Sequence, residues 1–376
     1  MAAVLLAITG LAIVLLYCLQ IGRYGLAIKK ASCVPPTGLP SNQLKISLVI
    51  PVRNEMEHLE NFLHDLSLQD YASPNYEVIF VDDHSEDGSA VFLGGVCSRV
   101  KNIKFFSLGE QEAGKKKAIN RGCEEATGTW IIQTDADCRI PAGFISGHAS
   151  MAGSGDADVI AGPVLAGERA GLWNMVESLE LMSLTGAGIA SGLIGKPVMC
   201  SGANLSYRKS FYEEVKHDLL GIPTASGDDI FLLLQAKKRN REILFFTSNK
   251  LLVTASPTGD PASFFRQRVR WGSKSRYYHD RELLYLAFLI WTANTVMTCF
   301  FAGSFLIVWM PWLFLISWLL KTGVEFILLY QTAVMFRRKR LLWLFPLAAI
   351  FYYFYITLAG ISSMAGRYQW KGRSYT

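Results

Sequence analysis

The stretch Thr129-Trp130-Ile131-Ile132-Gln133-Thr134-Asp135-Ala136-Asp137 joins an apolar run to two carboxylates that are two positions apart. The run predicts a short buried strand, in which successive side chains point to opposite faces. Where the strand becomes a loop, however, Asp135 and Asp137 can both reach one hard cation that prefers oxygen ligands. Any acidic turn after a strand also has this Asp-x-Asp (DxD) form, so the motif alone does not separate a metal site from a surface turn.

The sequence on either side of this stretch alternates between short apolar runs and helical patterns. A helix is predicted over residues 55–66, and a basic helix begins at residues 114–117. Strands are predicted at residues 45–50, 76–81, 103–108 and 130–133. This order predicts an α/β domain with a mostly parallel sheet and helices on both faces, in which ligands bind beyond the carboxyl ends of the strands.

Polar residues follow three of the predicted strands. Residues 51–55 follow the first, Asp82 and Asp83 open the polar turn 82–89 after the second, and residues 134–137 follow the fourth. Asp, Ser and Gly are ordinary turn residues, so the turn by itself fits a structural role as well as a functional one. Three polar strand ends that converge on one crevice favour a nucleotide site.

Composition and the N-terminus indicate a membrane protein. The 376 residues are 51% hydrophobic, which is above the range of ordinary soluble domains. Residues 1–22 carry no charge and precede Arg23, Lys29 and Lys30. A cleaved signal peptide has its basic residues before the apolar stretch, so this order favours an uncleaved anchor that ends in the cytoplasm.

The C-terminal region, residues 283–366, is long and apolar enough for about three further spans, at about 283–308, 312–336 and 341–364. Four spans in all would place the basic tail outside, against the positive-inside rule, so one segment could instead be re-entrant or interfacial. Lys321 and Glu325 are four residues apart and could pair on one helix face, but a position at the polar end of a span is the simpler interpretation.

Charge and cysteine content add little about function. The net charge of +6 is shared among membrane-flanking and loop positions, so topology near anionic lipid accounts for it and no nucleic-acid partner is indicated. Seven cysteines, an odd number without a Cys-x-x-Cys pair, are most simply reduced thiols. No protein partner is indicated either.

Seven motifs in sequence order resemble those of a family 2 glycosyltransferase with a GT-A catalytic domain. They cover roughly residues 44–275 and are residues 50–55, 81–89, 114–120, 135–137, 201–204, 227–229 and 267–271. The resemblance implies an inverting enzyme that moves a sugar from a nucleotide donor, usually a UDP sugar, onto an acceptor. The tail segment Trp370–Tyr375 is similar to that of ceramide-type lipid glucosyltransferases. The Gln-x-x-Arg-Trp (QxxRW) motif at residues 267–271 is similar, more distantly, to processive polysaccharide synthases.

The resemblance implies roles on the donor side. Asp83 would contact the uracil or the ribose and Lys115 the diphosphate, whereas Lys116 and Lys117 are expected in solvent. Asp137 would bind the Mg²⁺ or Mn²⁺ that bridges the diphosphate, and Asp135 would contact the ribose or the metal shell. Such a cation offsets charge on the departing diphosphate. The complete set of implied donor residues is Pro51, Val52, Asn54, Glu55, Asp83, Lys115, Asn120 and Asp135.

Asp229 is implied as the base that takes the proton of the acceptor hydroxyl, with Asp228 as the alternative. Both residues precede a helical run, so for the pair by itself the favoured explanation is two acidic residues that complement a helix N-terminus, and the order of the motifs is what favours the base. The family usually has Thr or Glu where Gly227 and Asp228 stand, which weakens any inference about the type of acceptor. The implied acceptor-side residues are Gly202, Ala203, Asn204 and Trp271.

Gln267, Arg270 and Trp271 are implied to close over donor and acceptor. They lie in an amphipathic segment, residues 261–282, that is predicted to rest on the membrane surface. Aromatic side chains would face apolar material and arginine side chains would face phosphates or headgroups. The aromatic residues are Phe264, Phe265 and Trp271, and the arginines are Arg266, Arg268 and Arg270.

These observations predict an integral protein of the cell inner or plasma membrane with a cytoplasmic catalytic domain. Its partners would be a nucleotide-sugar donor, a lipid or lipid-linked acceptor and the membrane. A processive polysaccharide synthase is the second hypothesis, and an inactive membrane scaffold that binds nucleotide sugar is the third. The predicted divisions are an anchor 1–22, a linker 23–43, the catalytic domain 44–260, the interfacial segment 261–282, the membrane region 283–366 and a basic tail 367–376.

Overall fold

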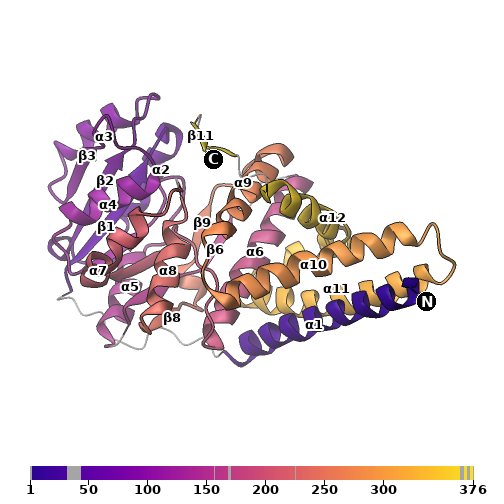
Figure 1. Cartoon of the computed structure of the whole chain (residues 1–376). Coiled ribbons are helices and arrows are strands. Elements are labelled where there is room, and N and C mark those ends of the chain that lie inside the picture. The colour runs from indigo at the N-terminus through magenta and orange to yellow at the C-terminus, as the bar shows by residue number, and fades with distance from the viewer. Residues whose placement is uncertain are drawn as a thin grey trace. The chain divides into compact units, whose positions relative to one another are not determined.

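The structure, a computed structural model, describes residues 2–31, 44–155, 157–167, 171–224, 226–364, 368–370 and 373–375. The chain forms two units, one built around a β-sheet and one built of helices (Figure 1). The α/β unit comprises Cys33–Gly167 and Pro197–Ser256. The helical unit comprises Met1–Ser32, Glu168–Lys196 and Pro257–Thr376, so residues 168–196 group with the helices although the sequence placed them in the catalytic domain.

The strands of the α/β unit are β1 Ile46–Val52, β2 Tyr76–Asp82, β3 Ile103–Ser107, β4 Trp130–Gln133, β5 Val159–Ala161, β6 Val164–Ala166, β7 Leu205–Arg208, β8 Ile243–Phe245 and β9 Val253–Ala255. Its helices are α2 Met56–Ser67, α3 Ser89–Cys97, α4 Lys115–Glu125, α5 Phe144–Gly153, α7 Lys209–Leu220 and α8 Asp228–Lys238, with short 3₁₀ turns at Ser73–Asn75 and Asn249–Leu251. The four strands and two helices predicted from the sequence are all present, with ends that agree within two residues where an end was predicted.

The main sheet has seven strands in the order β3-β2-β1-β4-β7-β5-β8. β7 is antiparallel to both of its neighbours and the other pairs are parallel, which confirms the predicted mostly parallel sheet. A second sheet pairs β6 with β9. The ends of β1, β2 and β4 that carry the polar residues lie side by side, because these strands are parallel neighbours.

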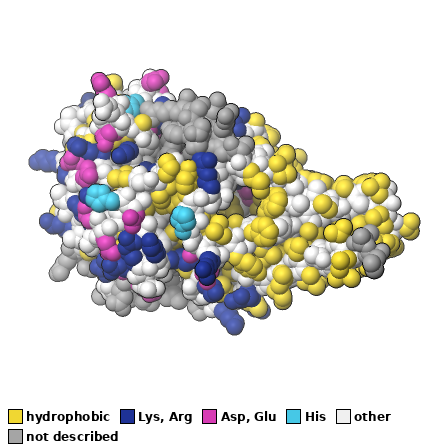
Figure 2. Space-filling view, in the orientation of Figure 1, with side chains coloured by type: hydrophobic (Ala, Val, Ile, Leu, Met, Phe, Trp, Pro, Cys, Tyr) yellow, Lys and Arg dark blue, Asp and Glu magenta, His cyan; other side chains and the backbone are white. Residues whose placement is uncertain are grey.

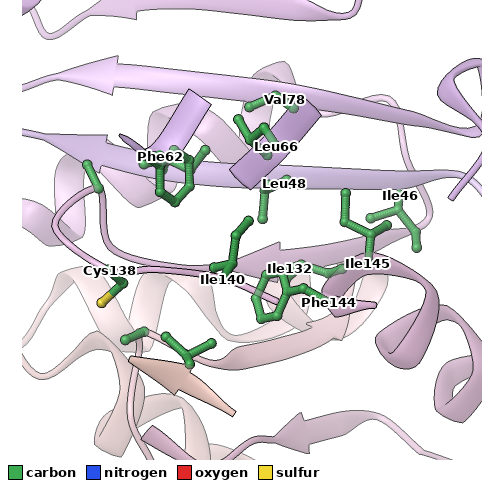
Figure 3. Packing of buried hydrophobic residues seen from close by; sticks show 14 of the residues in the cluster. Ile46, Leu48, Phe62, Leu66, Val78, Ile132, Cys138, Ile140, Phe144 and Ile145 are labelled. Atoms are coloured by element: carbon green, nitrogen blue, oxygen red, sulfur yellow. The ribbon is translucent and has the colours of Figure 1, made fainter. Parts of the chain in front are cut away.

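Helices cover both faces of the sheet, as predicted. On β1, Leu48 packs into a cluster with Phe62 of α2 and Phe144 of α5 (Figure 3). The next residue, Val49, points to the other face, where it meets Gly122 of α4. A Cβ on Gly122 would overlap the Val49 side chain, so the glycine permits α4 to approach the sheet closely. Because successive side chains of β1 point to opposite faces of the sheet, neighbouring residues of this strand pack against two different helical layers.

The helical unit contains α1 Ala2–Lys30, α6 Leu172–Leu193, α9 Pro261–Ser273, α10 Arg281–Gly303, α11 Met310–Met335 and α12 Phe345–Met364. It also has 3₁₀ turns at Lys274–Tyr277 and Lys339–Leu344 (η4) and the short strands β10 Tyr368–Trp370 and β11 Arg373–Tyr375. α1 ends at Lys30, so residues 23–30 of the predicted linker are helical, and residues 32–43 lie outside the described part of the chain.

Among the residues that the structure describes, four helical stretches are long and apolar enough to cross a membrane. They are Val4–Lys30, Arg281–Gly303, Met310–Met335 and Lys339–Met364, which confirms one N-terminal and three C-terminal candidates. Figure 2 shows hydrophobic side chains over the outer parts of α1, α10 and α11, whereas Lys, Arg, Asp and Glu gather over the α/β unit. The six described cysteines are unpaired, as expected, and Cys33 lies outside the described residues.

Lys321 and Glu325 lie in the middle of α11 and form an ion pair of 2.6 Å. Lys321 is 1% exposed, and the hydroxyl of Tyr17 on α1 donates a hydrogen bond of 2.6 Å to Glu325. The preferred interpretation from the sequence, a polar end of a span, is therefore wrong, and the paired alternative is right. A charge inside an apolar helix bundle needs such partners because neither lipid nor hydrocarbon side chains can solvate it.

α12 packs along α9 with its C-terminal half. The ring of Tyr355 lies 5.2 Å from that of Phe264, and Ser363 lies directly against Gly272 near the end of α9. β10 then continues beside α9. The C-terminal end of α12 is thus at the α9 end of the helical unit, and two residues predicted in the tail, Arg367 and Lys371, lie outside the described residues.

Candidate active site

The loops after β1 and β2 are joined by hydrogen bonds. The backbone N–H of Asn54 donates to Ser85 Oγ at 2.9 Å, and Asn54 Oδ1 accepts from the N–H of Glu86 at 2.8 Å. Asn54 has φ of 53°, a left-handed conformation that asparagine tolerates better than most residues. Asp87 Oδ2 accepts from the N–H of Met56 at 2.9 Å. Much of the polar turn 82–89 therefore shapes the strand ends, which is the structural role that the sequence left open.

Asp83 ties the end of β2 to the start of α4. Its Oδ2 accepts a hydrogen bond of 3.0 Å from the N–H of Gly114, and its Oδ1 lies 3.7 Å from the guanidinium of Arg53. The Asp83 side chain is buried. Asp83 thus lies at the end of β2 beside the start of α4, where these two partners fix its orientation. Its implied role on the donor side stays a prediction.

Lys115, the first residue of α4, is the centre of a charged cluster. Its Nζ lies 2.6 Å from Asp135 Oδ1 and 3.9 Å from Asp228 Oδ2. Burial acts against the positive charge, but the carboxylates of Asp135, Asp228 and Asp229 outweigh it and raise the pKa of Lys115 above the usual lysine value. Segments that are far apart in the sequence therefore supply one lysine and three carboxylates to one place.

Gln133 belongs to this cluster and was not recognised in the sequence. Its Nε2 donates to Asp228 Oδ2, and its Oε1 accepts a hydrogen bond of 3.4 Å from the hydroxyl of Tyr207. The side chain is fully buried at the last position of β4. The available signal was a polar amide inside an apolar strand directly before the DxD motif, because a buried amide requires polar partners.

Asp228 and Asp229 form the first turn of α8, which follows Gly227 with φ of 100°. Asp229 Oδ2 accepts a hydrogen bond of 3.0 Å from the N–H of Gly202. Asp228 is buried against Gln133, whereas Asp229 is only half-buried. The pair complements a helix N-terminus, and Asp229 is the carboxylate with more access to solvent.

Gly202 has no room for a side chain. A Cβ built on Gly202 would lie 2.7 Å from Gln133 Nε2, 3.0 Å from Asp228 Oδ2 and 3.3 Å from Lys115 Nζ. We expect Gly202→Ala to push this cluster apart, to lower the free energy of unfolding by about 1–3 kcal/mol, and to reduce binding of any ligand held by Lys115. Thermal unfolding of the purified protein in detergent measures the first effect.

Gly221 provides the control for this prediction, because it follows α7 and its nearest neighbours are two backbone carbonyls at 3.3 and 3.8 Å rather than the charged cluster. A Gly202→Ala protein that unfolds and binds ligand like Gly221→Ala would contradict the proposed crowding.

The DxD carboxylates fit a divalent cation that takes its other ligands from a bound molecule. Asp135 and Asp137 are both partly exposed, and Asp135 also holds Lys115. Burial and the neighbouring charge of Asp137 raise the pKa of Asp135, a repulsion that a cation would relieve. No group of three or more His, Cys, Asp or Glu in the described residues is arranged to hold a metal. Mg²⁺ needs only one or two carboxylates when phosphates supply the remaining oxygens.

Two implied ligand residues have their side chains engaged within the α/β unit. Asn204 is fully buried, its Nδ2 donates to the carbonyls of Pro163 at 3.0 Å and Leu251 at 2.9 Å, and its Oδ1 lies 3.0 Å from His148 Nε2. Asn120 Nδ2 donates to Glu124 at 3.0 Å. We therefore treat both as residues that support the site rather than as contacts to a ligand.

Lys116 is not in solvent, which corrects the expectation from the sequence. Its Nζ is buried and donates to the carbonyls of Leu219 at 3.3 Å and Ile222 at 2.5 Å. Burial lowers the pKa of Lys116 to about 8. Lys117 is exposed, as expected.

The motif residues Gln267, Arg270 and Trp271 lie on α9 in the helical unit. Asp260 caps this helix, and its side chain accepts from the N–H groups of Ala262 and Ser263 at 2.9 Å. The predicted apolar packing of Phe264 is confirmed, because it contacts Trp173 and Tyr355. The prediction that Arg268 faces headgroups is wrong, because Arg268 is buried and paired with Glu180.

Comparison with known proteins finds a family match over somewhat less than half of the chain, most of it in the α/β unit. Residues 47–216 match the family described as Glycosyl transferase family 2. The chain is 30% identical over 120 residues to Glycosyltransferase AglE of Haloferax volcanii, which covers 32% of this chain and 39% of that protein. It is 34% identical over 112 residues to the undecaprenyl-phosphate 4-deoxy-4-formamido-L-arabinose transferase of Yersinia enterocolitica, which covers 30% of this chain and 34% of that protein. The matched region thus spans less than half the length of these relatives.

A solved structure extends the likeness to the fold of nearly the whole chain. The mannosyltransferase PcManGT from Pyrobaculum calidifontis, in complex with GDP-Man and Mn²⁺, aligns with a TM-score of 0.60 at 16% identity. The alignment covers 96% of this chain and 97% of that one. At this identity the comparison establishes the fold.

Proposed function

We propose that the chain, whose residues 47–216 match Glycosyl transferase family 2 and whose α/β fold is of the GT-A type, is an inverting, metal-dependent glycosyltransferase. It moves a sugar from a nucleotide sugar, most simply a UDP sugar, to a membrane lipid or a lipid-linked acceptor. The cluster of Lys115 with Asp135, Asp228 and Asp229 is the observation that carries the proposal. In this cluster Lys115 would bind phosphate, Asp135 would help to bind the metal and Asp229 would serve as the base.

In this proposal Lys115 exchanges partners when the donor binds. Its Nζ is held by Asp135 at 2.6 Å in the structure, and a diphosphate would offer a stronger negative charge to the same ammonium group. Asp137 and Asp135 would hold the divalent cation, which offsets charge on the departing diphosphate when it is bound. Asp83, Glu55 and the backbone around Val52 would line the nucleoside end.

Asp229 acts as the base in a single displacement. It takes the proton of the acceptor hydroxyl while that oxygen forms the new bond to the anomeric carbon, and the bond from this carbon to the diphosphate oxygen breaks on the opposite face. The N–H of Gly202 holds one carboxylate oxygen at 3.0 Å and the N–H of Ile230 holds the other at 2.7 Å. These bonds fix the orientation of the carboxylate.

A lipid acceptor is supported by the four helices that are apolar enough to cross a membrane and by the lipid named for the relative from Yersinia enterocolitica. The proposal is tested by incubating the purified full chain with radiolabelled UDP and GDP sugars, Mg²⁺ or Mn²⁺, and extracted membrane lipids. We expect an organic-soluble product that carries one added sugar. A polymer would instead support the processive synthase, and no transfer from any donor would overturn the enzyme proposal.

We further propose that the catalytic domain and the tail lie on the same, cytoplasmic side. α10 runs antiparallel to α1, because Phe300 packs on Gly10, and α11 brings Leu328 beside Gly25. The basic end of α1, the start of α10 and the end of α11 therefore share one end of the helical unit. Since α12 returns along α9 to this end, it would be re-entrant rather than a fourth span. The basic tail would then lie on the cytoplasmic side, as the positive-inside rule requires.

Protease protection in sealed membrane vesicles tests this topology. An epitope placed after Thr376 is expected to be cleaved in the same vesicle orientation as the α/β unit. An epitope in residues 304–309, between α10 and α11, serves as the control and should be cleaved only in the opposite orientation. Cleavage of the tail together with the 304–309 epitope would show that α12 crosses the membrane.

A further inference from the structure

Arg268 occupies an unusual position for a charged residue. It is the second residue of the motif 267–271, and its side chain is buried on α9. Its guanidinium lies 4.2 Å from the ring centroid of Phe264 and 4.2 Å from that of Trp271. Phe264, Arg268 and Trp271 follow the i, i+4, i+7 spacing of one helix face. The arginine is therefore stacked between two aromatic rings, one of which belongs to the motif.

Glu180 of α6 neutralises this buried charge. Nε of Arg268 donates to Glu180 Oε2 at 2.8 Å, and a terminal guanidinium nitrogen donates to the same oxygen. The other oxygen, Oε1, accepts a hydrogen bond of 3.1 Å from the hydroxyl of Tyr355 on α12. Glu180 is itself buried, so its orientation is fixed on both sides.

The remaining terminal nitrogen of Arg268 reaches a second motif residue. It donates to Oε1 of Gln267, the first residue of the motif. One turn earlier on α6, Glu177 accepts from the N–H of Thr258 at 3.0 Å and from its hydroxyl at 2.9 Å, and Thr258 lies in the loop that leads into α9. α6 therefore holds both α9 and the segment that precedes it.

We propose that Arg268 is a positioning residue that fixes the side chains of Gln267 and Trp271, with Glu180 as its anchor. A buried ion pair contributes little net stability compared with apolar packing, so the consequence of this pair is geometric. The planar guanidinium stacks on Trp271, pairs with Glu180 and directs Gln267 at the same time. The inference rests on the proposed function, because Gln267 and Trp271 are the motif residues that the glycosyltransferase resemblance implies to close over donor and acceptor.

Arginine is required for this arrangement because lysine cannot reproduce it. A lysine ammonium is a compact charge without a planar face. It can neutralise Glu180, but it cannot at the same time stack on two rings and hold Gln267. Arg268→Lys is accordingly the informative change, since it preserves the charge in the buried site. Glu180→Gln, which keeps an acceptor for Arg268 without the negative charge, is the second variant should Arg268→Lys not fold.

The kinetic test is a double-mutant cycle between Arg268→Lys and Trp271→Phe in the full chain. We expect Arg268→Lys to lower kcat by about 10- to 100-fold, the size found for residues that orient a functional side chain, with the donor KM unchanged. Because part of the effect of Arg268 passes through Trp271, the loss in the double mutant should be smaller than the sum of the two single losses, expressed as free energies. Strictly additive losses would overturn the inference.

The matched control is Arg276→Gln. Arg276 is also an arginine stacked on an aromatic ring, at 4.8 Å from Tyr277, but it is exposed and lies outside the motif. It should leave kcat unchanged. If this segment were sensitive to the loss of any arginine, kcat would fall equally in Arg268→Lys and Arg276→Gln.

A readout without catalysis separates this inference from the proposed function. In protein labelled with 5-fluorotryptophan, the ¹⁹F resonance of Trp271 is identified by its loss in Trp271→Phe. We expect this resonance to move in Arg268→Lys and to stay in place in Arg276→Gln. If the wild-type chain transfers no sugar, the proposed function fails while the resonance still decides the position of Trp271, and an unmoved resonance overturns the positioning role.

Discussion

Replacing Asp229 with asparagine is expected to lower kcat by about 10³-fold, within the range that general bases contribute. Asparagine has nearly the same shape and keeps one oxygen to accept from the N–H of Gly202, so the fold should persist. It cannot take a proton, however, and the acceptor hydroxyl would have to attack without a base. Single-turnover transfer of labelled sugar, measured with donor in excess, reports this loss directly.

Two further variants make the Asp229 result specific. Asp218→Asn is the control, since Asp218 is an exposed residue of α7 that pairs with Arg239 at 2.9 Å, and exposed pairs of this kind matter little. Asp228→Asn tests the alternative base. If Asp229 is the base, Asp228→Asn should mainly disturb Gln133 and Lys115 and thereby weaken donor binding. A large loss of kcat in Asp228→Asn together with a small loss in Asp229→Asn would instead assign the role of the base to Asp228.

The sequence predicted the strand ends well because local patterns determine them. Apolar runs that stop at Asp82 or Asp135 give both the strand and its carboxyl edge, and parallel neighbours bring these edges together without further information. Asp135 was predictable as a site residue for the same reason, whereas Gln133 of the same cluster was not recognised. The hydrogen bonds of the cluster were not predictable, because they depend on the contact of β4 with the turn at Gly202 and the start of α8, about 70 and 95 residues away.

The main error of the predictions from sequence was to place buried charged residues in solvent or at headgroups. Burial of a charged residue depends on partners that are distant in the sequence. Lys116 was expected in solvent, but carbonyls at the end of α7 accept from it. Arg268 was grouped with Arg266 and Arg270, although residues two apart on a helix point to different faces. Its spacing to Phe264 and Trp271 was the overlooked signal. The partner itself, Glu180, is 88 positions away and has no local signature.

Membrane spans show the same division between local and distant information. Length and hydropathy identified four candidate helices, and the charges at Lys321 and Glu325 were visible. Whether that pair was exposed depended on Tyr17 of α1, and the course of α12 depended on its packing against α9. Neither contact can be read from the composition of one segment.

Asp137→Ala is expected to lower kcat by about 10³-fold and to abolish stimulation by Mn²⁺. A cation at the departing diphosphate stabilises the transition state by several kcal/mol, and about 4 kcal/mol corresponds to this factor. Asp137 should matter more to the metal than Asp135, because Asp135 also holds Lys115 at 2.6 Å. Activity measured over a range of Mn²⁺ concentrations separates weaker metal binding from a loss of the catalytic step.

The comparison with Asp135→Asn makes the order of the two carboxylates testable. Asp137 remains to bind the metal, so Asp135→Asn should retain a response to Mn²⁺. Its donor KM should rise, because Asp135 is the partner that holds Lys115 in place beside the diphosphate site before the donor binds. Glu60→Ala, an exposed carboxylate on α2, is the control for loss of negative charge. If wild-type transfer persists in a chelator, no metal is needed and Lys115 alone would offset the charge of the diphosphate. If Asp137→Ala still responds to Mn²⁺ like the wild type, Asp137 does not bind the metal.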